Sequence, residues 1–431
     1  MSRPPGHQSE LARQAALFAA RGDMDGAAAV YRTLLEKTPD HAPALAFLSA
    51  HAFGRGEFEQ SAAYARAAAE LMPDDPMLAQ NLGVALREVG RLDEARAALA
   101  RAIRLQPDFA TAQLHFGTVQ EQLGDAESAI RAYARALQLE PQLERLGADA
   151  AAPAAMRGPV RRALAARRRE HRALHDAILV ELESRCGGSA LERVSDFLRL
   201  FHGEAEPEYA HPLQKPDWQY FPGLEPRPFF EREEFAWVER LEAGWRGIRD
   251  ELLAVLAGDA GIEPYVPGLE RPPQLWRELS GSLDWSAFQL LKGGRPVGPN
   301  VARCPQSMAV IETLDLAAAP PHTPEAFFSI LKPGTHIPPH FGLSNLKLAV
   351  HLALLIPASC GIRVGAETRH WEEGKCLIFD DSFEHEAWNR SAELRAVLIV
   401  EAWNPGLSGV EREAIGRIIA ASESFNAKWQ P

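Results

Sequence analysis

Four series of residues recur in the first third of this sequence with one spacing of 34 positions. The first series is glycine, at Gly22, Gly56, Gly90 and Gly124. The second is proline, at Pro39, Pro73, Pro107 and Pro141. The third is a small residue, at Ala27, Ser61, Ala95 and Ala129, and the fourth an apolar residue, at Leu48, Leu82 and Phe116. A shared period in four independent series indicates a chain built from stacked repeats.

Each repeat is expected to contain two amphipathic helices. Glycine ends the first helix, because it adopts the left-handed conformation that other residues avoid. The small residue lets the second helix pack closely, and proline stops that helix. One unit cannot bury its apolar face alone, so neighbouring units must stack. Residues 9–144 therefore resemble an array of tetratricopeptide repeats. Such an array forms a groove, which favours recognition of a peptide or protein; the alternative is that it only supports the next domain.

The bulk properties exclude several other classes of protein. A chain of 431 residues is too long for one ordinary core. Its formal net charge of −12 argues against a general nucleic-acid-binding role. The N-terminus has no signal-peptide pattern and no apolar run could span a membrane, so a cytoplasmic protein is expected. The four cysteines lie far apart without a Cys-x-x-Cys motif, which favours neither a zinc site nor a disulfide framework.

Residues 145–211 are expected to form a linker followed by a helical segment. The stretch 145–157 is rich in alanine, glycine and proline, and Val160–Arg185 has helical spacing. That helix carries a basic cluster, formed by Arg161, Arg162, Arg167, Arg168, Arg169 and Arg172. The cluster is a solvated helix face or, alternatively, a site for nucleic acid or an acidic partner, although no aromatic residues are interleaved with it. A further helix is expected at about Phe235–Leu256.

Short β runs separated by turns dominate the sequence after residue 325. The expected strands are Phe327–Leu331, Leu348–Ile356, Gly361–Val364, Lys375–Phe379, Glu384–Trp388 and Leu394–Glu401. They are too short and too closely spaced for a parallel sheet with crossover helices. An antiparallel double-stranded β-helix, or jelly roll, is the natural closure. The fold class is therefore multidomain α + β, with an all-α solenoid before a jelly-roll domain with flanking helices.

Several histidines gather among these strands, at His336, His340, His351, His370 and His385. Two histidines at strand ends on opposite sides of a sandwich can converge on one point, and neutral imidazole suits iron(II). The usual iron site adds a carboxylate two residues after the first histidine. That position is Gly342 here, so spacing alone does not establish a metal site.

The local sequence resembles the aspartyl/asparaginyl β-hydroxylase family. The resemblance rests on the segments FFSILKPGTHIPPHFGLSN, HLALLIP, CGIRVGAETRHWEEGKCLIFDDSFEHEAWN and LRAVLIVEAWNP. A weaker match reaches upstream through KPDWQYFPGLEPRPFF, so the oxygenase-like domain would cover 212–405, before a C-terminal helix and tail at 406–431. Repeats before an oxygenase domain also fit this family.

The resemblance implies a site for iron(II), 2-oxoglutarate and O2. The family binds iron with two histidines and has glycine in place of the carboxylate, so His340 and His385 would be both the catalytic residues and the metal ligands. Ser329 and Arg395 would hold the distal carboxylate of 2-oxoglutarate, since an arginine fork pairs with both oxygens. His351 would lie near the keto-acid end.

Two positions leave alternatives open. The family usually has arginine two residues before the histidine matched by His351, where this chain has Ala349. Lys347 would point to the same face of a strand and could replace that arginine; otherwise 2-oxoglutarate binds more weakly, or the ligand differs. Asp381 would orient an imidazole in the second shell of the metal, or simply form a turn.

The implied function is a dioxygenase that hydroxylates the β-carbon of Asp or Asn residues in a peptide or protein recognised partly by the repeats. One alternative is a repeat scaffold with a degenerate oxygenase domain. Another is an oxygenase that acts on a small amino acid or an acyl lipid.

Overall fold

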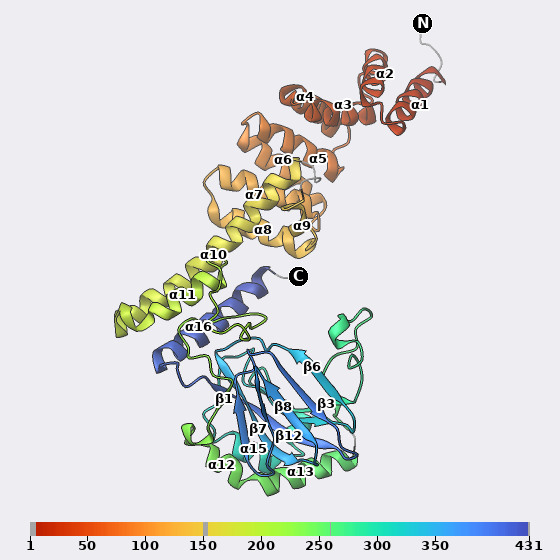
Figure 1. Ribbon diagram of the computed structural model, residues 1–431. Helices are drawn as coiled ribbons and strands as arrows, with labels where there is room; N and C mark the ends of the chain where they lie inside the picture. Colours follow the sequence, from red (N-terminus) through yellow and green to blue (C-terminus); the bar gives the residue numbers. More distant parts are fainter. Residues whose placement is uncertain (1–5, 150–153, 259, 430–431) are drawn as a thin grey trace. The chain divides into compact units, whose positions relative to one another are not determined.

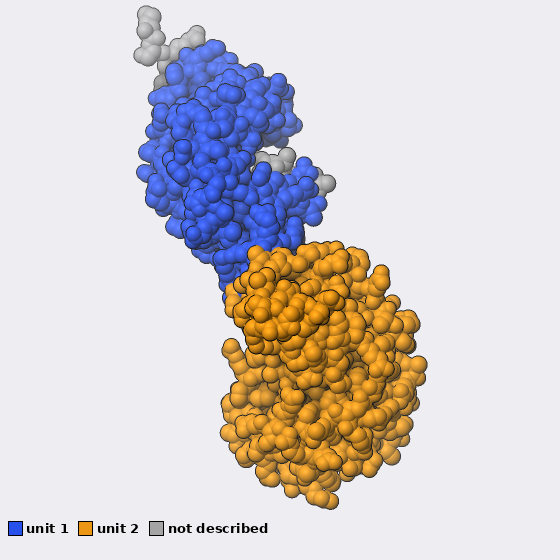
Figure 2. All heavy atoms as spheres, turned by 90° about the vertical axis from the view of Figure 1, so that its left-hand side faces the viewer, with its two compact units in different colours: residues 1–171, 425–431 blue, residues 172–424 orange. Residues whose placement is uncertain are grey.

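The computed structural model describes residues 6–149, 154–258 and 260–429. The chain divides into two compact units, residues 1–171 with 425–431 and residues 172–424 (Figure 2). Part of the expected linker, residues 150–153, lies outside the described residues, as do the first five residues of the chain.

The first unit begins with four pairs of helices (Figure 1). They are α1 (Gly6–Ala20), α2 (Met24–Lys37), α3 (Ala42–Gly54), α4 (Phe58–Leu71), α5 (Pro76–Glu88), α6 (Leu92–Leu105), α7 (Ala110–Gln122) and α8 (Ala126–Leu139). The periodic glycines follow the first helix of each pair with φ between +77° and +84°, as the repeat pattern predicts. The periodic small residues are buried. The helical repeat array is therefore confirmed.

The last repeat is covered by the short helix α9 (Leu143–Leu146) and the first part of α10 (Ala154–Cys186). Val160, Ala163 and Ala166 of α10 pack in one apolar cluster with residues of α8. Four of the six arginines of the basic cluster lie beside acidic side chains: Arg167 pairs with Glu144, Arg162 and Arg169 pair with Glu121, and Arg172 pairs with Asp176. These contacts favour a structural role for the cluster.

The second unit contains two antiparallel sheets. Their strands are β1 (Phe229–Phe230), β2 (Glu263–Pro264), β3 (Trp285–Lys292), β4 (Arg295–Pro296), β5 (Ala326–Leu331), β6 (His336–His340), β7 (Lys347–Leu355), β8 (Cys360–Val364), β9 (Glu367–Arg369), β10 (Cys376–Phe379), β11 (His385–Asn389) and β12 (Arg395–Trp403). The large sheet has the order β1-β10-β7-β12-β5-β3-β2, with β4 beside β3. The small sheet has the order β6-β11-β8-β9.

From β5 to β12 the chain alternates between the two sheets, apart from the β8–β9 hairpin. This winding is that of a jelly roll, as expected from the strand pattern. The facing sides of the sheets share one apolar cluster, in which Ile337, Ile362 and Ala387 of the small sheet meet Leu331 and Phe379 of the large one. The sandwich core between the sheets holds the residues discussed below.

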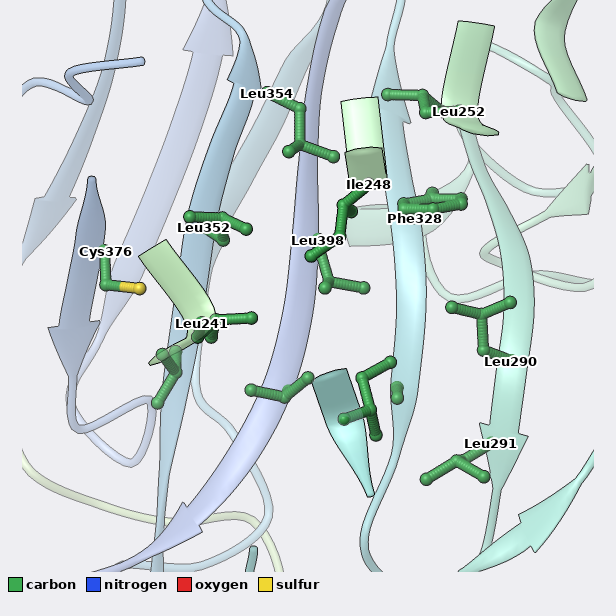
Figure 3. Close-up of a cluster of buried hydrophobic side chains, with 14 of the residues drawn as sticks. Leu241, Ile248, Leu252, Leu290, Leu291, Phe328, Leu352, Leu354, Cys376 and Leu398 are labelled. Carbon is green, nitrogen blue, oxygen red and sulfur yellow. The ribbon is translucent and has the colours of Figure 1, made fainter. Parts of the chain in front are cut away.

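Helices cover the outer face of the large sheet. They are α12 (Val238–Ala243), α13 (Trp245–Gly258), α14 (Gly298–Val301) and α15 (Pro305–Ile311). Ile248 and Leu252 of α13 pack against this face in one cluster with Phe328 and Leu398 (Figure 3). The single helix expected at Phe235–Leu256 is two helices, α12 and α13, which meet at Gly244. A Cβ there would lie 2.8 Å from Cγ2 of Val310, so glycine permits close packing of α15.

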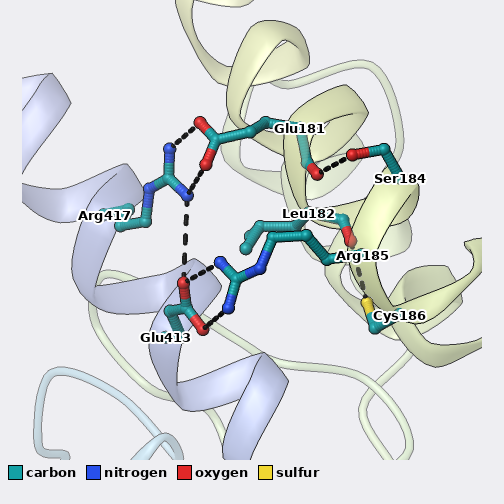
Figure 4. Close-up of polar contacts among 7 residues, drawn as sticks. All are labelled: Glu181, Leu182, Ser184, Arg185, Cys186, Glu413 and Arg417. Atoms are coloured by element: carbon teal, nitrogen blue, oxygen red, sulfur yellow. Dashed lines mark hydrogen bonds and ion pairs between the residues drawn. The ribbon is translucent and has the colours of Figure 1, made fainter.

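The second unit also contains α11 (Glu192–Phe201) and parts of α10 and α16 (Gly409–Trp429). Arg185 of α10 donates to Glu413 of α16 at 2.7 Å, and Arg417 of α16 pairs with Glu181 of α10 (Figure 4). Three short 3₁₀ turns complete the structure, at Gly188–Leu191, Arg232–Glu234 and Gln274–Trp276. No described helix is both long enough and apolar enough to span a membrane.

Candidate active site

A cavity of about 820 Å³ opens between the two sheets of the second unit. The residues to which the family resemblance drew attention line it: Ser329, His340, Lys347, Ala349, His351, Asp381, His385 and Arg395. They come from five strands and one turn, so the fold brings together residues up to 66 positions apart (329 to 395). His336 and His370 do not line the cavity.

His340 and His385 face each other across the edge of the small sheet. His340 ends β6 and His385 begins β11, where the two are register partners with ring centroids 4.1 Å apart. Nδ1 of His340 donates to the carbonyl of Pro338 at 2.8 Å, and Nδ1 of His385 donates to the carbonyl of Phe383 at 2.9 Å. Because a carbonyl only accepts, each proton lies on Nδ1 and each Nε2 keeps its lone pair.

Burial keeps both imidazoles neutral. It lowers the pKa of His340, and burial together with the nearby His340 lowers the pKa of His385 to about 3. A histidine binds a metal as neutral imidazole, so at neutral pH neither histidine would have to release a proton before a metal could bind. Within the described residues, no group of three or more His, Cys, Asp or Glu side chains could hold a metal ion. The arrangement therefore offers two nitrogen ligands from one pair of strands.

The carboxylate of Asp381 lies where a side chain at position 342 would be. A Cβ on Gly342 would stand 2.5 Å and 2.6 Å from the two oxygens of Asp381. The Asp381 oxygen Oδ1 has no hydrogen-bond partner, and burial raises the pKa of this carboxyl to about 7. Asp381 does not orient the imidazole of His385, since the Phe383 carbonyl accepts from that Nδ1. The residue, in the turn after β10, instead places its carboxyl group beside Gly342, two positions after His340.

We expect Gly342→Ala to destabilise the protein by about 1–3 kcal/mol, because the added methyl overlaps the Asp381 carboxylate. Chemical denaturation would measure the loss. Gly298→Ala is the matched control, since a Cβ there meets nothing within 4 Å. The double variant Gly342→Ala/Asp381→Gly should regain most of the stability; equal losses in the single and double variants would contradict the overlap.

Arg395 is the largest fully buried side chain of the described residues, with 1% of its surface exposed. No described carboxylate lies within ion-pair distance of it, and its guanidinium stacks on Trp371 at 4.0 Å. Its Nε has no hydrogen-bond partner, and burial lowers its pKa to about 9. It is thus a buried cation at neutral pH, and such a charge is costly unless a ligand pairs with it. Ser329, on the neighbouring strand, is equally buried.

His351 lies in β7 between these groups and the histidine pair. It packs edge-on against Phe379 with ring centroids 4.9 Å apart, and its Nδ1 has no partner. Burial lowers its pKa well below the usual value, with a further contribution from Arg395. His351 is therefore a neutral polar group available to a ligand in the cavity.

Lys347 faces the cavity on the same side of β7 as Ala349 and His351, as its spacing predicts. Its ammonium, however, forms an ion pair with Glu401 of β12. Burial opposes the charged form of Lys347, but the charges of Glu401 and Asp381 outweigh burial and raise its pKa. The sequence left open that Lys347 replaces the missing arginine as a free positive charge. In the structure, the charge of Lys347 is neutralised by Glu401.

Several cavity residues did not stand out in the sequence. Trp285 of β3 donates from Nε1 to Oγ of Ser329 at 3.2 Å, and Trp276 packs edge-on against His340 at 5.0 Å. Glu325, just before β5, and Glu401 of β12 also line the cavity. Trp285 could have been found from the sequence, because it is the aromatic residue that begins the apolar run WSAFQLL. No local sequence pattern separates Glu325 or Glu401 from the other glutamates of the chain.

Comparison with known families agrees with this geometry. Residues 242–405 match the family described as aspartyl/asparaginyl beta-hydroxylase, and these bounds contain both histidines, Arg395 and every other residue that lines the cavity. This region of the chain is similar to that hydroxylase family. Residues 13–76 and 81–144 match the tetratricopeptide repeat, so the hydroxylase domain follows a repeat array.

Three relatives share the hydroxylase domain. An aspartyl/asparaginyl beta-hydroxylase of Mus musculus is 37% identical over 46% of this chain and 26% of its own length. An aspartate beta-hydroxylase domain-containing protein 2 of Xenopus tropicalis is 33% identical over 48% of this chain and 55% of its own. An ornithine lipid ester-linked acyl 2-hydroxylase of Rhizobium tropici is 34% identical over 41% of this chain and 61% of its own length. The matches span between a quarter and about three-fifths of these relatives.

Proposed function

We propose that this chain is an iron(II)- and 2-oxoglutarate-dependent dioxygenase that hydroxylates the β-carbon of Asp or Asn residues in a peptide or protein. The observation that carries the proposal is the buried, unpaired cation of Arg395 in a cavity that also holds two neutral histidines. A bidentate carboxylate is the ligand that such a guanidinium favours. The names of the relatives support a hydroxylation reaction.

The residues fit the two groups that this reaction needs. His340 and His385 would hold iron(II) through Nε2, with the Pro338 and Phe383 carbonyls fixing their rings. Arg395 and Ser329 would bind the distal carboxylate of 2-oxoglutarate, and His351 would contact its other end. When bound, iron(II) with 2-oxoglutarate and O2 supplies the oxidant for an unactivated C–H bond. The apolar residues Ile337, Ile362 and Ala387 exclude water around it.

The repeat array is proposed to hold the polypeptide substrate. A hollow of about 470 Å³ lies on α4 and the end of α5, lined by the side chains Glu59, Ala62, Ala63, Arg66, Ala67, Glu70, Val89 and Arg91. Its small residues leave room for a bound chain, and its charged ones offer both signs for hydrogen bonding. These features support recognition of a peptide over mere support of the next domain.

The direct test uses the purified chain with iron(II), ascorbate, 2-oxoglutarate and isotopically labelled O2. We expect succinate to form and one labelled oxygen to enter an Asp- or Asn-containing peptide, detected by mass spectrometry. If no 2-oxoglutarate binds by calorimetry and no succinate forms, the chain is instead a scaffold with a degenerate domain.

A hydroxylase of acyl lipids is a second candidate. It is favoured by the Rhizobium tropici relative, whose name gives an acyl chain as the substrate. Leu343, which lines the cavity, is 53% exposed, and nearby Trp218 is 50% exposed. Labelled oxygen in a 2-hydroxyacyl product, with none in peptides, would select this function.

A further inference from the structure

The cavity is polarised along the strands of the large sheet. Arg395 and Ser329 lie toward one end. Toward the other end, Glu325 and Glu401 are placed side by side by the pairing of β5 with β12, one position beyond the Val400–Ala326 pair. Glu401 lies about four residues along β12 from the Val397–Ser329 pair, which corresponds to about 13 Å in a strand. The far end is therefore separate from the cation of Arg395.

The ammonium of Lys347 at this acidic end is already occupied. Glu401 forms the ion pair with it through one oxygen. The other oxygen of Glu401 accepts from Oγ1 of Thr323 at 2.6 Å and from the backbone N–H of Glu325 at 2.8 Å. Because three donors hold this carboxylate, Lys347 and Glu401 form a fixed pair with no net charge.

The remaining groups at this end are two carboxyl groups, those of Glu325 and Asp381, and the polar side chains of Tyr265 and Gln289. Glu325 accepts one backbone N–H, from Gly293 at 2.6 Å, and Asp381 has an oxygen without a partner. Lys292 of the lining is exposed at the end of β3, and the imidazole of His322 contacts Glu423 at 2.9 Å. A ligand here meets two carboxyl groups with free acceptor capacity, the remaining N–H donors of Lys347, and the side chains of Tyr265 and Gln289.

We propose that this end of the cavity selects an uncharged amide, so that the enzyme acts on asparaginyl side chains in preference to aspartyl ones. An amide has two N–H donors for the carboxylates and one oxygen for Lys347. An aspartyl carboxylate offers acceptors only and adds a negative charge beside Glu325 and Asp381, where burial already disfavours the charged form of each carboxyl group. The inference rests on the proposed function and specifies its substrate.

Two peptide libraries would test the preference. They differ only in Asn or Asp at one central position, with random flanking residues, and the full chain is supplied with iron(II), ascorbate and 2-oxoglutarate. We expect kcat/KM for the Asn library to exceed that for the Asp library by about tenfold or more. Glu325→Gln removes one charge, and its amide oxygen can still accept from Gly293, so we expect it to narrow the ratio severalfold.

Two further variants sharpen the result. Glu401→Gln frees the charge of Lys347 and should also favour the Asp library. Glu372→Gln is the control: it removes an exposed carboxylate outside the cavity and should leave the ratio of kcat/KM between the two libraries unchanged. Equal turnover of the two libraries, or a ratio that neither cavity variant alters, overturns the amide preference alone. Absence of labelled oxygen from both libraries overturns the proposed function as well, and 2-oxoglutarate binding and succinate formation report on that function independently.

Discussion

Replacing His385 by alanine is expected to abolish iron(II) binding and to lower succinate formation by about 100-fold or more. The reason is geometric: His385 and His340 are the two neutral imidazoles that converge across β6 and β11, and the described residues offer no group of three ligands that could compensate. His340→Ala should have the same effect. Anaerobic equilibrium dialysis with iron(II), followed by a succinate assay, would measure both quantities.

His336→Ala is the matched control for these variants. His336 lies on the same strand as His340, but it does not line the cavity and pairs with Glu386 at 2.7 Å on the surface. Its removal should leave iron binding and turnover close to those of the unaltered chain. Retention of full iron affinity by His385→Ala would place the metal elsewhere and remove the basis of the proposed function.

Replacing Arg395 by methionine is expected to weaken 2-oxoglutarate binding by about 30-fold or more, since losing one partner of a buried charged pair costs about 2–5 kcal/mol. The same change should not lower the melting temperature of the ligand-free protein. Without ligand, the guanidinium is a buried charge that no described carboxylate neutralises, and an apolar side chain of similar length suits that environment better. Calorimetry and thermal unfolding, each with and without 2-oxoglutarate, would separate the two effects.

Arg390→Met provides the comparison for Arg395. Arg390 is exposed and lies over the ring of Trp388, outside the cavity. We expect no change in 2-oxoglutarate affinity. A ligand-free Arg395→Met protein that is much less stable, with unaltered affinity, would show that Arg395 serves only the fold.

Most strands of the jelly roll follow from the sequence because their apolar runs are bounded by turn residues. β6 does not, since HIPPH contains two prolines in five residues and proline normally excludes a strand. The structure tolerates them because β6 is an edge strand that pairs only with β11. β3 was also missed: it is buried along almost its whole length, and such a run shows no alternation that separates strand from helix.

The residues of the candidate site also fall into those that the sequence revealed and those that it did not. The histidines, Ser329 and Arg395 were accessible through family resemblance, and the structure brings them into one cavity. The partner of Lys347 was not accessible, because Glu401 is 54 positions away and is placed by strand register. The carboxylate beside Gly342 likewise comes from a distant turn. Contacts of this kind depend on tertiary packing and leave no local trace.

The prolines of β6 also limit how a polypeptide can approach the cavity. In a strand, successive N–H groups point to opposite sides, so one of the two adjacent prolines, Pro338 or Pro339, faces the free edge of the small sheet without a donor. An incoming chain cannot extend the sheet there by regular backbone pairing. If the substrate is a polypeptide, as proposed, we expect it to present a side chain to the cavity rather than pair with β6 as an added strand.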